Sequence, residues 1–199
     1  MKRFFFTVLA AISLWLPVSA QATAGTPTDL LKERDTNIRS FLKANPLPLP
    51  APKRSKIEED LNSLFDYETI AISSLGAHKQ KATPKQLQEY IRVFSQVTRN
   101  NSSSEDALKH FLQSQIRYEG EAKGPNGATV VKTVIIKNNE EITVDYFFEN
   151  TKSGWRIVNY VLDDVDLIEN YRSSFGKIIS EKGFDELISK LKEKLKKKD

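Results

Sequence analysis

The 199-residue sequence contains no cysteine and only two histidines, His78 and His110. The absence of cysteine excludes disulfides, thiol nucleophiles and Cys-ligated metal sites, so core packing alone must hold the fold together. The two histidines lie far apart in the chain and offer neither a closely spaced pair of metal ligands nor an evident base for a serine nucleophile. The residue inventory therefore predicts no metal site.

The common catalytic motifs are also missing. No G-x-S-x-G sequence occurs, and none of the eight glycines belongs to a phosphate-binding loop. Asp145 is the one carboxylate embedded in an apolar strand pattern, but alternation places it on the solvent face, opposite Val144 and Tyr146. We therefore predict no catalytic residue, no cofactor and a protein that is not an enzyme.

Only one long apolar run is present, at the N-terminus. Lys2 and Arg3 precede the apolar residues 4–16, and small-residue cleavage patterns end at Ala20 and Ala24. This order is typical of a secretory signal peptide, and the run is shorter than the roughly 20 residues that a membrane-spanning helix needs. We predict that residues 1–24 are a signal peptide cleaved near residue 20 or 24.

The rest of the chain, residues 25–199, is long enough for a single domain with a sizeable core. A disulfide-free exported protein is more typical of the bacterial periplasm than of eukaryotic secretion, so we expect a periplasmic location. The net charge of +4 is concentrated near the two ends of the chain. Such local basicity does not indicate a nucleic-acid partner.

The first half of the chain predicts helices with clear starts. Thr26-Pro27 and Thr83–Gln86 combine an N-cap residue with proline at the first helical position, while Ser55–Glu58 and Ser102–Glu105 have the form of capping boxes. Residues 45–52 hold four prolines at alternate positions. Because proline blocks the helix and restricts the residue before it, this segment predicts an extended strap.

The second half changes to the two-residue period of strands and ends in two amphipathic helices separated by Gly183. Short turns connect four strand-like segments, which begin near Ile116 and continue over residues 129–136, 142–148 and 155–162. The expected fold class is α+β: a four-stranded, mostly antiparallel curved sheet packed by N- and C-terminal helices.

Three groups of motifs carry a family resemblance. Phe65-Asp66-Tyr67, Leu75-Gly76 and residues 82–86 follow the pattern F-D-[FY]…L-G…[AT]-x-P-x-Q. Residues 155–158 follow W-[KR]-[IV]-x, and residues 167–175 resemble S-L-[IV]-x-N-Y-R-x-x-F. In order and spacing, these motifs resemble the MlaC, or toluene-tolerance, family of periplasmic phospholipid-binding proteins.

The sequence departs from the family pattern at three places. Lys79 stands where an aromatic residue is usual, and Asn159 stands where the W-[KR]-[IV]-x strand usually continues with Asp. Asp164-Val165-Asp166 replaces the usual G-[VI]-S before the penultimate helix.

The resemblance implies a cone-like fold with an apolar cavity that holds a phospholipid as cargo. It also implies a monomeric carrier that shuttles lipid between the outer and inner membranes. The implied transient partners are an inner-membrane ABC transporter complex and an outer-membrane lipoprotein complex. Three alternatives remain. The first is a hopanoid-related lipid carrier, and the second is a purely structural periplasmic module, which predicts a solid core. The third is a cone-fold enzyme acting on an apolar substrate, which needs a carboxylate, such as a buried Asp145, or a histidine facing into the cone.

Strand alternation assigns Val144, Tyr146 and Phe148 to one face, which we expect to point inward. The predicted lipid-binding residues are apolar or aromatic and lie on the strands and on flanking helices: Phe65, Leu75, Val134, Ile136, Val144, Tyr146, Phe148, Trp155, Ile157, Tyr171 and Phe175. Arg172 is the candidate for the phosphate of the lipid head group. The alternative for Arg172 is a structural ion pair with Asp66 or Glu169.

Overall fold

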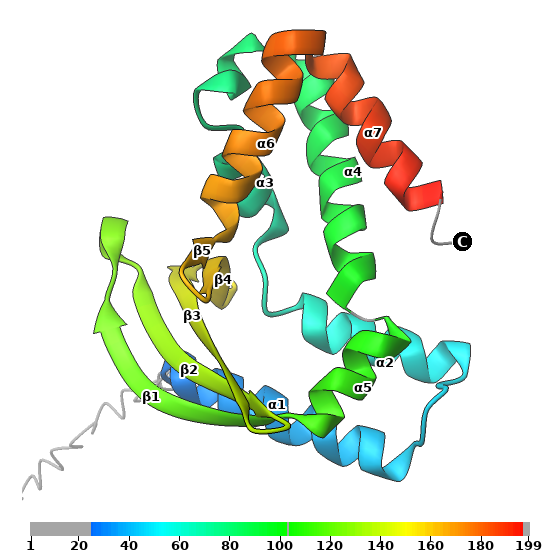
Figure 1. Ribbon diagram of the computed structural model, residues 1–199, viewed down its shortest axis with the longest axis vertical. Coiled ribbons are helices and arrows are strands. Elements are labelled where there is room, and N and C mark those ends of the chain that lie inside the picture. Colours follow the sequence, from blue (N-terminus) through cyan, green and yellow to red (C-terminus); the bar gives the residue numbers. More distant parts are fainter. Residues whose placement is uncertain (1–24, 103, 197–199) are drawn as a thin grey trace, which may run out of the picture.

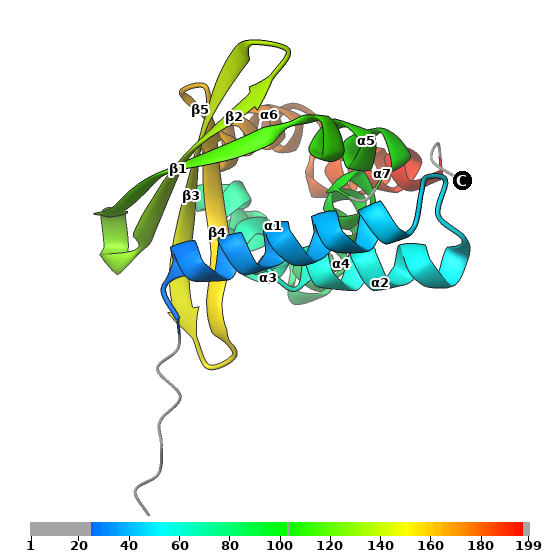
Figure 2. The same cartoon turned by 90° about the horizontal axis from the view of Figure 1, so that it is seen from below.

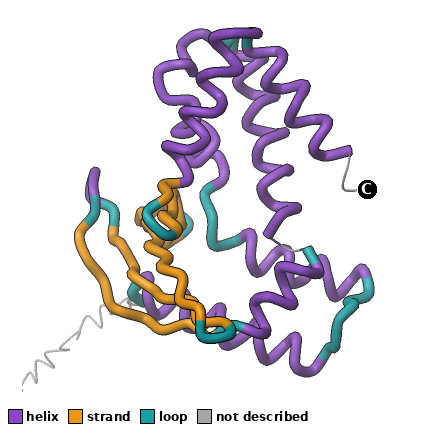
Figure 3. Tube along the Cα trace, in the orientation of Figure 1, coloured by secondary structure: helices purple, strands orange, loops and turns teal. Residues whose placement is uncertain are grey.

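The computed structural model describes residues 25–102 and 104–196, so the predicted signal peptide, residues 1–24, lies outside the described residues. The described part contains seven α-helices and an open antiparallel sheet with the strand order β1-β2-β3-β4-β5 (Figures 1 and 3). The α+β class is therefore confirmed. None of the described helices is long and apolar enough to cross a membrane.

Helices occupy both ends of the chain and flank the sheet. The α-helices are α1 Pro27–Ala44, α2 Ala51–Asn62, α3 Tyr67–Leu75, α4 Pro84–Ser102, α5 Glu105–Gln113, α6 Leu167–Lys182 and α7 Phe184–Lys196. The strands are β1 Gln115–Lys123, β2 Thr129–Lys137, β3 Glu140–Thr151, β4 Gly154–Leu162 and β5 Val165–Asp166. Two 3-10 helices, η1 Gly76–Lys81 and η2 Pro125–Gly127, complete the set.

Local capping explains where several helices begin. Thr26 caps α1 as predicted, and the Thr83 box caps α4: the Gln86 N–H donates to Thr83 Oγ1 over 3.2 Å and the Thr83 N–H donates to Gln86 Oε1 over 3.0 Å. The other two predicted boxes are wrong. Ser55 lies inside α2, which already begins at Ala51, because a proline such as Pro52 is tolerated in the first helical turn. The N-cap of α5 is Ser104, not Ser102. The extended strap is therefore limited to residues 45–50.

The four predicted strands are present, and a fifth, β5, was not predicted. It pairs with the end of β4, where Leu162 lies opposite Val165. A tight turn joins the two strands, with φ angles of 44° and 65° at Asp163 and Asp164. Two residues are too short for any periodicity, so the sequence pattern held no signal for this strand.

The molecule has two interiors on different sides of the sheet. Helices α3, α4, α6 and α7 form a bundle at one end, whereas α1 crosses the other side of the sheet (Figures 1 and 2). Helices α2 and α5 lie beyond the sheet and pack against the second half of α1. Strand β4 and the segment before α3 join the two parts, because the Asp66 N–H donates to the Ile157 carbonyl over 2.9 Å and the Ile157 N–H donates to the Leu64 carbonyl over 2.7 Å.

The bundle has a solid core of interlocking aromatic rings. Phe94 meets Tyr171 edge-on at 5.2 Å between centroids, and Tyr90 meets Phe184 at 5.8 Å. Tyr90 is fully buried, which raises the pKa of its hydroxyl, and that hydroxyl lies 2.6 Å from Ser74 Oγ. Ser74 Oγ in turn donates to a backbone carbonyl, so the buried pair is satisfied.

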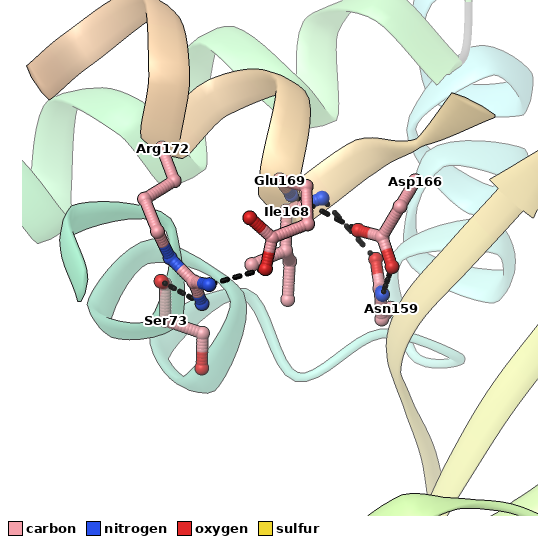
Figure 4. A network of polar contacts seen from close by, with 6 residues as sticks. All are labelled: Ser73, Asn159, Asp166, Ile168, Glu169 and Arg172. Carbon is pink, nitrogen blue, oxygen red and sulfur yellow. Dashed lines mark hydrogen bonds and ion pairs between the residues drawn. The ribbon is translucent and has the colours of Figure 1, made fainter.

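Two of the family motifs meet at the junction of α3 and α6. Gly76 has a φ of +52°, and a Cβ placed there would lie 2.9 Å from Cδ and Nε of Arg172. Arg172 pairs with Glu169 and donates to the Ser73 carbonyl over 3.3 Å (Figure 4). Glycine at position 76 thus permits both the turn and the close approach of α6.

Two of the departures from the family pattern also meet each other. Asn159 Nδ2 donates to Asp166 Oδ2 over 2.9 Å, and its Oδ1 accepts the Ile168 N–H at 3.3 Å (Figure 4). The other oxygen of Asp166 caps α6 by accepting the Glu169 N–H. A carboxylate at position 159 would face that of Asp166, so the amide suits an Asp cap.

Candidate functional site

An apolar cavity of about 380 Å³ lies on the side of the sheet that faces α1. Residues from the first, second and fifth helices, from the segment after α2 and from the first four strands line it: Leu31, Arg34, Asp35, Ile38, Leu61, Leu64, Phe65, His110, Phe111, Ser114, Ile116, Tyr118, Thr133, Ile135, Lys137, Ile142, Tyr146 and Ile157. The cavity is the most apolar of the hollows found in the described part of the chain.

Strand register determines which side chains reach this cavity. Ile135 pairs with Ile116 on one side and with Ile142 on the other, so three isoleucines stand in a row across β1, β2 and β3. Thr133 lies two residues earlier on the same face, and its hydroxyl donates to the Val144 carbonyl over 2.8 Å. The buried hydroxyl is therefore satisfied by the sheet and leaves the cavity wall apolar.

Two tyrosines bring their rings to the cavity without adding charge. Burial, with a smaller contribution from the nearby carboxylate of Asp35, raises the pKa of Tyr118 to about 12. Burial also raises the pKa of Tyr146, with smaller contributions from Tyr160 and Tyr118. Both phenols therefore stay neutral at physiological pH.

Charged residues lie along the cavity wall contributed by α1. Arg39 Nε donates to Asp35 Oδ1 over 2.8 Å, and its guanidinium lies 4.3 Å from the centre of the Phe111 ring. Arg34 forms a longer ion pair with Asp60, at 3.6 Å. Both arginines of α1 near the cavity thus have a carboxylate partner, whereas the Lys32 ammonium lies over the Tyr118 ring, 5.3 Å from its centre.

Three of the predicted site residues line the cavity: Phe65, Tyr146 and Ile157. Val144 and Phe148 occupy the same sheet face, but they are 3% and 0% exposed and pack into the surrounding core. Trp155 packs against that same core, next to Ile157.

The predicted placement of Val134 and Ile136 on this face is wrong. Val134 pairs with Thr143 and Ile136 pairs with Glu141, whereas Thr133 pairs with Val144. Val134 and Ile136 therefore point to the opposite side of the sheet. Residues 129–136 are apolar on both faces, so alternation could not fix the register within that segment.

Leu75, Tyr171 and Phe175 belong to the helical core and do not line the cavity. Arg172 is also outside it, and its ion pair with Glu169 matches the structural alternative considered for it. The family motif at residues 167–175 thus contributes to the core of the helical bundle and not to the cavity, because α6 leaves the sheet on the side away from α1.

The sequence reasoning missed the helical wall of the cavity. Leu31 and Ile38 lie on one face of α1, and His110 and Phe111 close the side formed by α5. The helical spacing of Leu31 and Ile38 was visible, but nothing local says which face of a distant sheet a helix will cover.

Asp145 lies opposite Lys132 and therefore on the sheet face that points away from the cavity. It therefore supplies no carboxylate inside the cone. Asp35 and His110 do line the cavity, where Asp35 pairs with Arg39 and the His110 ring contacts Lys137. Among the described residues, no group of three or more His, Asp or Glu side chains is placed to hold a metal ion.

A second hollow, of about 670 Å³, is larger but open and polar. It lies beside α4 and the β3–β4 turn, and Arg92, Arg99 and Arg156 are among its lining residues. Phe65 lines both this hollow and the apolar cavity. The apolar cavity is the better candidate site because most of its exposed wall is apolar and it is less open to solvent than the second hollow.

Fold and cavity together define an α+β domain in which a curved sheet and crossing helices enclose an apolar space. The family model described as MlaC protein matches residues 35–193. The chain therefore belongs to the MlaC family.

Individual proteins agree with this assignment. The toluene tolerance protein Ttg2D of Pseudomonas putida is 26% identical over 191 residues, an alignment that covers 93% of this chain and 85% of the relative. A phospholipid-binding protein of Ralstonia solanacearum, solved in complex with a phospholipid, matches with a TM-score of 0.73 and 19% identity. That match covers 87% of this chain and 99% of the Ralstonia protein, and it shows that the two share a fold.

Proposed function

We propose that this protein binds a phospholipid with its acyl chains in the apolar cavity and carries it through the periplasm between the inner and outer membranes. The observation that carries the proposal is the apolar cavity between the sheet and α1 in a chain of the MlaC family. The shared fold with a Ralstonia protein solved with a phospholipid supports it. The MlaC family is periplasmic, which agrees with the export expected from residues 1–24.

The energetics explain why such a carrier needs a cavity. A diacyl phospholipid carries about 30 methylenes, each costing about 0.8 kcal/mol in water, so bare transfer would cost roughly 24 kcal/mol. Moving the chains from a bilayer into an apolar cavity exchanges one apolar environment for another. The exchange is close to neutral, which allows both uptake and release.

The cavity volume indicates that the walls move when a lipid enters. At about 380 Å³ the cavity lies near the lower end of the range of roughly 300–1,000 Å³ for small-molecule sites, and a two-chain lipid needs more room. Helix α1 forms the outer wall and is connected to α2 through residues 45–50. We expect α1 to shift away from the sheet in the loaded protein.

A carrier needs no catalytic groups and no nucleotide site, because energy can come from a membrane complex. The proposed partners are an inner-membrane ABC transporter complex and an outer-membrane lipoprotein complex, each contacted transiently by a monomeric carrier.

Native mass spectrometry of the protein purified without detergent tests the binding step. The expected spectrum shows a lipid adduct whose mass identifies its class, phospholipid or hopanoid. Transfer between donor and acceptor vesicles then tests carriage. A protein that purifies without lipid and also fails to extract phospholipid from vesicles would contradict the proposal.

A further inference from the structure

Among the residues that the structure describes, one pair of basic side chains at the edge of the cavity has no acidic partner. Lys137 is the last residue of β2, and His110 lies in the last turn of α5. Lys137 Nζ contacts Nδ1 of the His110 ring, and both residues line the cavity. Two elements far apart in the sequence thus bring two nitrogen groups to one point of the rim.

The two arginines near the cavity are neutralised by carboxylates. Arg34 pairs with Asp60, and Arg39 pairs with Asp35. Within residues 25–102 and 104–196, by contrast, Lys137 makes no ion pair with a carboxylate, although Glu140 is its cross-strand neighbour. Lys137 is therefore the one cavity-lining cation in this part of the chain whose charge is not matched by an acid.

We propose that Lys137 and His110 bind the phosphate group of the lipid head group, an assignment that rests on the proposed function. In a phospholipid the phosphate is only a few bonds from the start of the acyl chains. A lipid with its acyl chains inside the cavity therefore has its phosphate at the cavity rim. The Lys137 ammonium offers three donors and the His110 ring offers an N–H, so both can donate to the phosphate oxygens. Exposure of His110 at the surface leaves room for the rest of the head group.

The proposal makes a specific statement about selectivity. A phosphodiester carries a negative charge in zwitterionic and in anionic phospholipids alike. The pair therefore distinguishes phospholipids from neutral lipids with the same chains, such as diacylglycerol. It does not distinguish phospholipid classes from one another.

The test compares two lipids that differ only in the head group. Delipidated full-length mature protein is titrated with phosphatidylcholine and with diacylglycerol of identical acyl chains, for the wild type, Lys137→Gln and His110→Gln. We expect each substitution to weaken phosphatidylcholine binding about ten-fold and to leave diacylglycerol binding unchanged. Lys132→Gln is the matched control, because Lys132 is exposed on the other face of the same strand.

The other outcomes are equally informative. Equal losses for both lipids, or no loss for either, would overturn the phosphate assignment while leaving lipid binding intact. A wild-type protein that binds neither lipid would overturn the proposed function along with it. Inorganic phosphate is a separate arm, and Lys137-dependent binding of inorganic phosphate without lipid would assign the pair to free anions instead.

Discussion

The two interiors of this protein are built from similar apolar residues but pack differently. In the bundle, Tyr90, Phe94, Tyr171 and Phe175 interlock, with neighbouring ring centroids 5.1–6.1 Å apart. Between the sheet and α1, aliphatic side chains and separate aromatic rings line a space of about 380 Å³. Large planar rings fill one interior, whereas a curved sheet and a crossing helix leave the other partly open.

The difference separates stability from function within one small domain. A close-packed core loses both contacts and transfer free energy when a side chain is shortened. A wall that already borders a cavity has fewer contacts to lose, so it tolerates change and can adapt to a ligand. We therefore expect the helical core to contribute most of the stability, and the cavity between the sheet and α1 to be the part that binds a ligand.

The largest expected effect comes from opening the helical core. Phe94 is 1% exposed, and Phe94→Ala should lower the free energy of unfolding by about 3–5 kcal/mol, as measured by urea denaturation. Ile142→Ala, at the cavity wall, is the comparison and should cost distinctly less, because it enlarges an existing space. Equal losses for the two variants would show that the two interiors do not differ as described.

The next effect concerns lipid binding rather than stability. Ile135 lines the cavity, and Ile135→Trp should fill it and abolish lipid co-purification. Ile136 is the next residue on the same strand and points to the opposite side, so Ile136→Trp should leave the lipid bound. Mass spectrometry of the two purified proteins gives the answer. Loss of lipid in the Ile136 variant alone would reverse the face assignment.

A smaller effect is expected where strand β4 meets helix α6, between the two interiors. Asn159→Asp places a carboxylate beside that of Asp166 and should cost about 1–3 kcal/mol, because it replaces an N–H···O contact with two acceptors. Asp166→Ser restores a neutral cap, so the double variant should recover part of the loss.

The two single variants and the double variant form a double-mutant cycle with the wild type, and urea denaturation measures the free energy of unfolding of each. Additive losses would mean that Asn159 and Asp166 are independent and that their joint departure from the family pattern has no physical link.

The sequence predicted local structure better than it predicted the site. Caps at Thr26 and Thr83 and the turns between strands depend on neighbouring residues, so they were readable. Ser55–Glu58 failed because a capping pattern inside a helix has the same letters as one at its start.

The cavity depends on relations between distant segments, and those relations are not local. Alternation placed Tyr146 and Ile157 on the face that borders the cavity, but it placed Ile136 on the wrong face, because β2 is apolar on both faces. Tyr171 looked like a cavity residue because an aromatic stripe on a helix has the same pattern whether it fills a core or lines a space. Only the position of α6 relative to the sheet distinguishes these cases.

The smallest expected effect lies on the surface of the bundle, where Glu89 links α4 to α7. Hydrogen bonds from Arg92 and Lys192 lower the pKa of Glu89 from 4.5 to about 2. Since the folded pKa lies below the unfolded one, this contribution to stability is present above pH 4.5 and is lost as the pH falls toward 2. Glu89→Gln should therefore have a slightly lower thermal midpoint than the wild type near neutral pH, with the difference disappearing in acid. Glu193→Gln, on the exposed side of α7, is the control and should show no such trend. A Glu89→Gln difference that stays constant from neutral pH down to pH 2 would mean that the ion pairs do not stabilise the contact between α4 and α7.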